Sequence, residues 1–243
     1  MLSECQQRWN SVLNGISNYK TLLDQLEHWR QGREEVCIVT FNYDTLIEDA
    51  LRSIGIPINE ITDYISGREY KLIKLHGSVN WGKRIENPTM ALLGADPWLI
   101  VKTLIDSKSA WTVTDEYRVI TSRPIAALAG REVFSPALAI PVQTKKSYEC
   151  PATHLVALES VLPQVSKVLL IGWRGAEDHF AKLLREKLPQ DCLFHVVAGT
   201  TKAATEVTKR LENSGIAGRF GYSTGGFTGF ILNREADTFL RLP

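Results

Sequence analysis

The chain has 243 residues, of which 44% are hydrophobic and 23% charged, and its formal net charge is +1. This is the composition of a folded globular protein with enough chain to bury a core. A nearly neutral chain without a Lys/Arg run argues against direct nucleic-acid binding. Apolar stretches such as 168–172 are too short to cross a bilayer, and the N-terminus lacks the pattern of a secretion signal. We therefore expect a cytoplasmic protein without a membrane partner.

The four cysteines, Cys5, Cys37, Cys150 and Cys192, lie far apart and form no CxxC pair. This spacing supports neither a zinc ribbon nor a redox pair, and no metal site is predicted. Cys37 and Cys192 lie in apolar runs, which favours small core residues over nucleophiles.

Hydrophobic periodicity predicts a helical segment over 1–35, followed by strands that alternate with helices. The predicted strands are 36–41, 70–75, 137–142, 167–171 and 193–198, and the predicted helices after 1–35 are 46–54, 154–162, 176–188, 202–214 and 230–240. We interpret 78–135 as an insertion or small subdomain within a single domain, 1–243. This order predicts an α/β, Rossmann-like fold with a mostly parallel sheet flanked by helices.

In such sheets, ligands bind beyond the carboxyl ends of the strands. The segments directly after strands are therefore the places to seek a site, and here they are 40–44, 75–78, 172–174 and 199–200. A simpler interpretation remains open for two of them. Residues 42–44 also suit an ordinary turn in which Asp44 or Thr45 caps the next helix, and His76-Gly77 also suits a turn.

Four segments, in order, resemble SIR2-like domains, which are relatives of the sirtuins. They read TFNYDTLIED at 40–49, KLHGSVNW at 74–81, ALAIPVQTKK at 137–146 and LLIGWRGAEDHF at 169–180. The first is similar to the T-x-N-Y-D segment of that family and the second to its strand-end His-Gly. A set of motifs in a shared order is more specific than any single one.

The resemblance implies a site that binds NAD as substrate and uses no metal. Its implied catalytic pair is Asn42 and His76. The implied cofactor-binding residues are Thr40, Phe41, Asp44, Gly172, Trp173, Arg174, Gly199 and Thr200. Of these, Asp44 lies near the nicotinamide end in the family, 172–174 hold the adenosine half, and 199–200 lie near its ribose.

The chain departs from sirtuins in three ways. No Gly-Ala-Gly-x-Ser loop precedes Val36, so either the chain begins late or the phosphate cradle is lost. Trp173-Arg174 replaces a small hydroxyl residue, and there are no zinc-binding cysteines. The last departure favours the zinc-free, NAD-hydrolysing branch, many members of which resemble bacterial antiphage effectors.

We therefore expect an NAD⁺ glycohydrolase that acts in antiphage defence. The alternatives are a catalytically degenerate domain that senses NAD or ADP-ribose or serves as a scaffold, and an enzyme that transfers ADP-ribose to protein. The expected ligand is NAD or ADP-ribose. A fused or separate defence-system protein and a homo-oligomer are further partners that the resemblance allows.

Two other patterns have plainer interpretations. Residues 221–225 fit G-x-S-x-G, but no histidine follows Ser223 as the hydrolase order requires, so we predict a Gly/Ser-rich loop. The other histidines (His28, His154, His179, His195) are predicted to be structural or exposed, and three tryptophans (Trp81, Trp98, Trp111) to serve packing.

Overall fold

The computed structural model describes residues 17–30, 33–86, 102, 112–120, 132–139 and 148–242. The chain divides into two compact units. The first unit holds the described residues from 36 to 155, and the second holds those from 17 to 35 and from 156 to 242. The prediction of a single domain, 1–243, stays a prediction.

A parallel pair of strands lies at the centre of the first unit. Strands β1 (Val36–Thr40) and β2 (Tyr70–Lys74) pair in register from Val36↔Tyr70 to Thr40↔Lys74. Helices α3 (Leu46–Ser53) and α4 (Asp63–Ser66) lie between them in the sequence. The strands predicted at 36–41 and 70–75 are thus confirmed.

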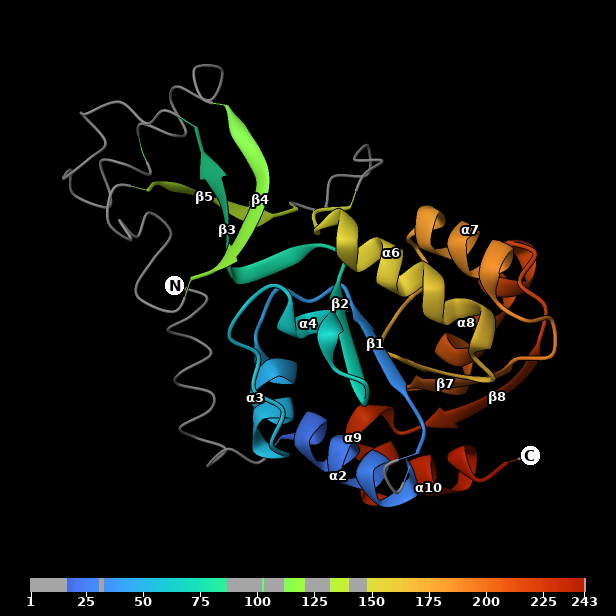
Figure 1. The fold of residues 1–243 in the computed structure, drawn as a ribbon. Coiled ribbons are helices and arrows are strands. Elements are labelled where there is room, and N and C mark those ends of the chain that lie inside the picture. The colour runs from blue at the N-terminus through green and yellow to red at the C-terminus, as the bar shows by residue number, and fades with distance from the viewer. Residues whose placement is uncertain are drawn as a thin grey trace. The chain divides into compact units, whose positions relative to one another are not determined.

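The first unit also contains a three-stranded antiparallel sheet with the order β4-β3-β5 (Figure 1). Its strands are β3 (Gly77–Ile85), β4 (Val113–Val119) and β5 (Phe134–Leu138). The strand predicted at 137–142 was wrong in its start, because it begins at Phe134, and it pairs antiparallel with β3 instead of joining a parallel sheet. The pairing extends through Ser135 and Pro136, which the apolar pattern alone did not include, because ladder bonds rather than hydrophobicity set where a strand begins.

The second unit is built on a parallel sheet with the order β6-β7-β8. Its strands are β6 (Lys167–Ile171), β7 (Leu193–Ala198) and β8 (Arg219–Thr224). Helix α8 packs on β7 and β8, and α9 also contacts both strands. The remaining helical elements are α2 (Asn18–Arg30), α6 (Ala152–Val161), which spans the boundary between the units, η1 (Leu162–Gln164), α7 (Asp178–Lys187), α8 (Thr201–Asn213), α9 (Gly226–Leu232) and α10 (Glu235–Leu240) (Figure 1).

Two predictions for the C-terminal part were wrong. The predicted loop at 221–225 is mostly strand β8, paired along its length with β7 from Leu193↔Arg219 to Ala198↔Thr224. Its Gly, Ser and Thr content is typical of loops, but tertiary pairing overrides such local preference. The single helix predicted at 230–240 is two helices, because Arg234 adopts a left-handed conformation (φ 53°) that ends the helical path.

The fold is mixed α/β, with parallel sheets flanked by helices, as the sequence predicts for a Rossmann-like chain. The predicted strands at 167–171 and 193–198 match β6 and β7. Several predictions lie outside the described residues: the helical segment over 1–16, Trp98, Trp111 and the end of the motif at 140–146. Within the described part, no helix has both the length and the hydrophobicity to span a bilayer.

Candidate functional site

Asn42 and His76 follow neighbouring strands of the parallel pair. The ladder ends at Thr40↔Lys74 and is continued by a hydrogen bond from Leu75 N to Thr40 O of 3.1 Å. Each of the two residues therefore stands two positions beyond the last registered pair, at the carboxyl edge of the strands. Asn42 is exposed and His76 is half-buried. This is the edge where parallel sheets bind their ligands.

The backbone around Asn42 is fixed by its neighbours' side chains. Thr40 Oγ1 accepts a hydrogen bond from Asn42 N at 3.1 Å, and Asp44 Oδ1 accepts one from Leu46 N at 3.1 Å. Asp44 is thus the residue that caps α3, since Thr45 makes no side-chain capping bond. The side chains of Thr40 and Asp44 hold the strand-to-helix turn that presents Asn42.

Tyr43 ties this turn to the antiparallel sheet. Its carbonyl accepts hydrogen bonds from Val79 N at 2.9 Å and from Ser78 Oγ at 3.3 Å. Its hydroxyl donates to Ala139 O at 2.6 Å, and burial raises its pKa. A neutral, anchored tyrosine therefore stands directly beside Asn42 in the chain.

His76 is surrounded by aromatic rings on the same edge. The Phe41 ring meets the imidazole edge-to-face at 5.1 Å between centroids, and the Tyr43 ring lies at 6.2 Å. The backbone carbonyl of His76 accepts from Ala139 N at 2.9 Å. These contacts restrict the imidazole's position and place apolar ring faces beside a group that can exchange a proton.

A buried polar chain lies behind the turn. Lys74 is fully buried, and its Nζ donates to Glu48 Oε1 at 2.8 Å and to the carbonyl of Asp44. Tyr64 OH also donates to Glu48 Oε1 at 2.9 Å, and Trp81 Nε1 donates to Tyr64 OH at 3.0 Å. Burial and the neighbouring Glu48 raise the Tyr64 pKa well above its ordinary value.

Sequence reasoning missed Lys74 and Glu48 as residues of interest. The available signal was a lysine inside the buried strand YKLIK, two residues before His76. A charged side chain that points into a core must have a partner, so its presence there indicates a specific acceptor nearby.

The second unit holds the other predicted residues, beginning with the turn after β6. Gly172 has a left-handed backbone (φ 67°), and a side chain there would meet nothing within 4 Å. The indole of Trp173 donates to Glu177 and packs edge-to-face on Phe180 at 5.3 Å. Arg174 is exposed, and its carbonyl accepts from Arg210 Nη1 at 3.0 Å.

Gly199 and Thr200 lie between β7 and α8 and are both exposed. Thr200 caps α8, because its Oγ1 accepts from Ala203 N at 3.2 Å. The structure therefore places Thr40, Phe41, Asn42, Asp44 and His76 together on one edge of the first unit. The five predicted residues at 172–174 and 199–200 lie at the carboxyl ends of two adjacent strands in the second unit.

Ser223 of the G-x-S-x-G pattern lies within a buried polar group. Its Oγ is 2.6 Å from His195 Nε2 and donates to the Glu235 carboxylate. Because the hydroxyl proton points to Glu235, the remaining bond is donated by His195 Nε2–H. A nucleophilic serine needs the opposite arrangement, in which histidine accepts its proton. With Ser223 only 3% exposed, this group joins α10 to the sheet.

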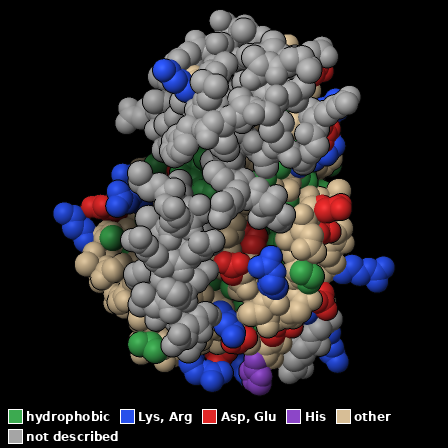
Figure 2. Space-filling model, turned by 90° about the vertical axis from the view of Figure 1, so that its left-hand side faces the viewer, with side chains coloured by type: hydrophobic (Ala, Val, Ile, Leu, Met, Phe, Trp, Pro, Cys, Tyr) green, Lys and Arg blue, Asp and Glu red, His purple; other side chains and the backbone are tan. Residues whose placement is uncertain are grey.

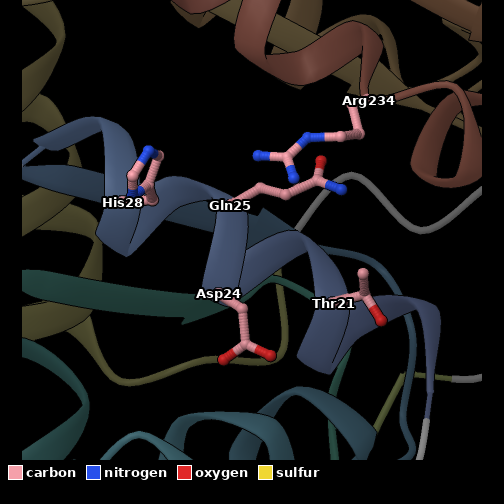
Figure 3. A pocket seen from close by; sticks show the side chains of 5 residues that line it. All are labelled: Thr21, Asp24, Gln25, His28 and Arg234. Atoms are coloured by element: carbon pink, nitrogen blue, oxygen red, sulfur yellow. The ribbon is translucent and has the colours of Figure 1, made fainter.

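A hollow of about 440 Å³ lies elsewhere in the second unit (Figure 3). It is lined by Thr21, Asp24, Gln25, His28 and Arg234, none of which is a predicted site residue. On the face shown in Figure 2, acidic and basic side chains are interspersed over the described surface. Among the described residues, no three His, Cys, Asp or Glu side chains gather as a metal site would require.

Cys37 and Cys192 do not offer a nucleophile. Burial raises the pKa of Cys37 to about 12 and, together with Asp191, that of Cys192 to about 11. A thiol with such a pKa stays protonated near neutral pH, which argues against a nucleophile at either position. Cys192 is a buried core residue, as predicted, whereas Cys37 is only partly buried.

Comparison with known families bears on the first unit. Residues 36–109 match the family model of the SIR2-like domain. This segment is similar to the SIR2-like family. The SIR2-like match includes β1, α3, β2 and β3, and with them Asn42 and His76, so the resemblance drawn from the sequence is confirmed over this range. The SIR2-like family includes NAD-related enzymes. No curated protein and no solved structure matches the chain.

Proposed function

We propose that the protein is an NAD⁺ glycohydrolase, which cleaves NAD⁺ with water to nicotinamide and ADP-ribose. The observation that carries the proposal is that Asn42 and His76 extend from paired strands at one edge of the SIR2-like segment. We also propose that the activity belongs to a bacterial antiphage response in the cytoplasm, as the resemblance to SIR2-like effectors implies.

The chemistry suits these two side chains. In the reaction, the bond between the nicotinamide nitrogen and the ribose carbon breaks, and its electron pair leaves with nicotinamide. Water adds to that carbon and releases one proton. The transition state resembles the oxocarbenium ion of glycoside cleavage. His76 accepts the proton, and the Asn42 amide, which both donates and accepts, orients water or a ribose hydroxyl.

The aromatic rings at the same edge support this assignment. Phe41 and Tyr43 face the imidazole and present apolar surface next to the reacting groups. Apolar walls limit stray water and strengthen the few polar contacts that remain. Asp44 is already engaged with Leu46 N, so we assign it the role of holding the turn near the nicotinamide end.

As the resemblance implies, we also propose 172–174 and 199–200 as nucleotide-binding residues, 172–174 for the adenosine half and 199–200 for the ribose. Two features support this assignment. The space beside Gly172 and Gly199 is open, because a Cβ placed at either position would meet nothing within 4 Å. A ligand can therefore approach the backbone closely there. Both follow parallel strands at their carboxyl ends, where nucleotides bind in such sheets.

The test is NAD consumption by purified protein, followed by chromatography of nicotinamide and ADP-ribose. Asn42→Ala and His76→Ala should each lower the turnover rate by about 100-fold or more, because a positioned acid or base contributes at least that much. The matched control is His28→Ala, which removes an exposed histidine from α2 in the second unit. Thermal unfolding of each variant checks that the fold is retained.

Three results would contradict the proposal. Full turnover by Asn42→Ala and His76→Ala would remove the mechanism. Calorimetric binding of NAD or ADP-ribose without turnover by the wild type would favour the sensor. A protein band labelled from radioactive NAD would favour transfer of ADP-ribose.

A further inference from the structure

Lys74 is a cation in a place where charge is costly. Its side chain is 0% exposed, and its Nζ lies 2.8 Å from Glu48 Oε1. The attraction within such a buried ion pair offsets the cost of desolvation only when all of its polar atoms have hydrogen-bond partners. Within the described part of the chain, Glu48 Oε2 is buried and has no hydrogen-bond partner. The pair is therefore expected to contribute little to the stability of the fold.

The second contact of Lys74 points to another role. Its ammonium also donates to the carbonyl of Asp44, which lies two residues after Asn42. Lys74 itself lies two residues before His76 and belongs to the strand that leads to it. One side chain thus joins the strand that carries His76 to the turn that carries Asn42.

The far side of the pair is anchored in the core. Glu48 Oε1 accepts from Tyr64 OH as well as from Lys74, and Trp81 Nε1 donates to Tyr64 OH. Trp81 is 2% exposed and Tyr64 is 1% exposed. Glu48 of α3 therefore holds the ammonium, and Tyr64 of α4 and Trp81 of β3 in turn fix Glu48. The position of the ammonium does not depend on solvent.

We propose that Lys74 is a positioning residue that sets the distance between Asn42 and His76 by holding the carbonyl of Asp44. This inference rests on the proposed NAD-cleaving function. Lys74 touches neither substrate nor water in this role. Because a small displacement of a reacting group slows the reaction about 100-fold, loss of the contact should lower kcat far more than it changes KM.

The test uses the double variant Lys74→Met/Glu48→Gln. It removes both charges together, and Gln at position 48 can still accept from Tyr64 OH, so the fold should be retained. We expect an unfolding midpoint within about 5 °C of wild type, kcat lower by about tenfold to 100-fold and KM changed by less than about threefold. The matched control is Lys71→Met on the same strand, which should leave kcat unchanged.

Two further measurements keep the inference distinct from the proposed function. Glu48→Gln alone keeps the contact between Lys74 and Asp44 and should keep kcat within about threefold of wild type. Hydrogen exchange needs no activity: the amide of Leu46, which donates to Asp44 Oδ1, should exchange about tenfold faster in the double variant. Wild-type kcat or wild-type exchange in a folded double variant would overturn the inference, as would an equal loss of kcat in Glu48→Gln. A wild type that leaves NAD intact would refute the proposed function, and the exchange measurement would still decide whether Lys74 holds the turn.

Discussion

Gly77 follows His76 directly and is the first residue of β3, just after the tight connection from β2. Its backbone is left-handed (φ 81°), and a Cβ at this position would lie 1.9 Å from the carbonyl oxygen of Ala137 and 2.8 Å from its carbon. Gly77→Ala therefore introduces two costs. The left-handed backbone costs about 1–2 kcal/mol for a residue with a Cβ. Overlap with a strand backbone that cannot rotate away costs about 1–3 kcal/mol more.

Gly55→Ala separates these two contributions. Gly55 is also left-handed (φ 86°), but a Cβ there meets nothing within 4 Å. Urea unfolding should thus show a loss of about 1–2 kcal/mol for Gly55→Ala and of about 2–5 kcal/mol for Gly77→Ala. Equal losses for the two variants would refute the argument that backbone overlap at Ala137 fixes the connection that carries His76.

Two further predictions concern the core behind the site. Trp81→Phe should lower the free energy of unfolding by about 1–3 kcal/mol, because it removes buried ring surface and the hydrogen bond to Tyr64 OH. Urea unfolding followed by circular dichroism measures this loss. An unchanged unfolding midpoint would contradict the prediction. Burial lowers the pKa of His154, whose Nε2–H donates to Ile61 O, so the unfolded chain takes up a proton before the folded one. The free energy of unfolding should then fall as the pH drops below about 6.5, the pKa of histidine in the unfolded chain. His154→Gln, which keeps a hydrogen-bond donor, should reduce this dependence on pH between about pH 7 and 5. A dependence as steep as in wild type would show that His154 does not cause it.

Much of the fold was predictable because its signals are local. The runs at 36–41 and 193–198 are rich in β-branched and apolar residues, and the structure has strands there. Asp44 was one of two capping candidates, and geometry decided for it because its carboxylate reaches Leu46 N. These features depend on residues that are close together in the sequence.

The errors share a different cause. Strand β8 has a loop-like composition and is a strand only because β7 lies beside it. The break at Arg234 depends on a backbone conformation that arginine seldom adopts, and no glycine or proline marks it. In both cases long-range packing overrides local preference, which a single sequence does not display.

The candidate site shows the same division. Asn42 and His76 could be named from motifs and strand ends, because parallel strands bring their carboxyl ends to a common edge. The contact from Lys74 to Asp44 spans 30 positions and depends on the pairing of β2 with β1, which brings Lys74 beside the turn that follows β1. Only the three-dimensional structure shows that Lys74, rather than a neighbouring lysine, reaches the turn.

The central claim is that the edge carrying Asn42 and His76 breaks the bond between nicotinamide and ribose with water as the acceptor. Incubation of the wild-type protein with NAD in ¹⁸O-labelled water, followed by mass spectrometry, tests it most directly. We predict equal amounts of nicotinamide and of ADP-ribose carrying one ¹⁸O atom, and almost none from His76→Ala. Intact NAD after prolonged incubation with the folded wild-type protein, or ADP-ribose without the label, would contradict it.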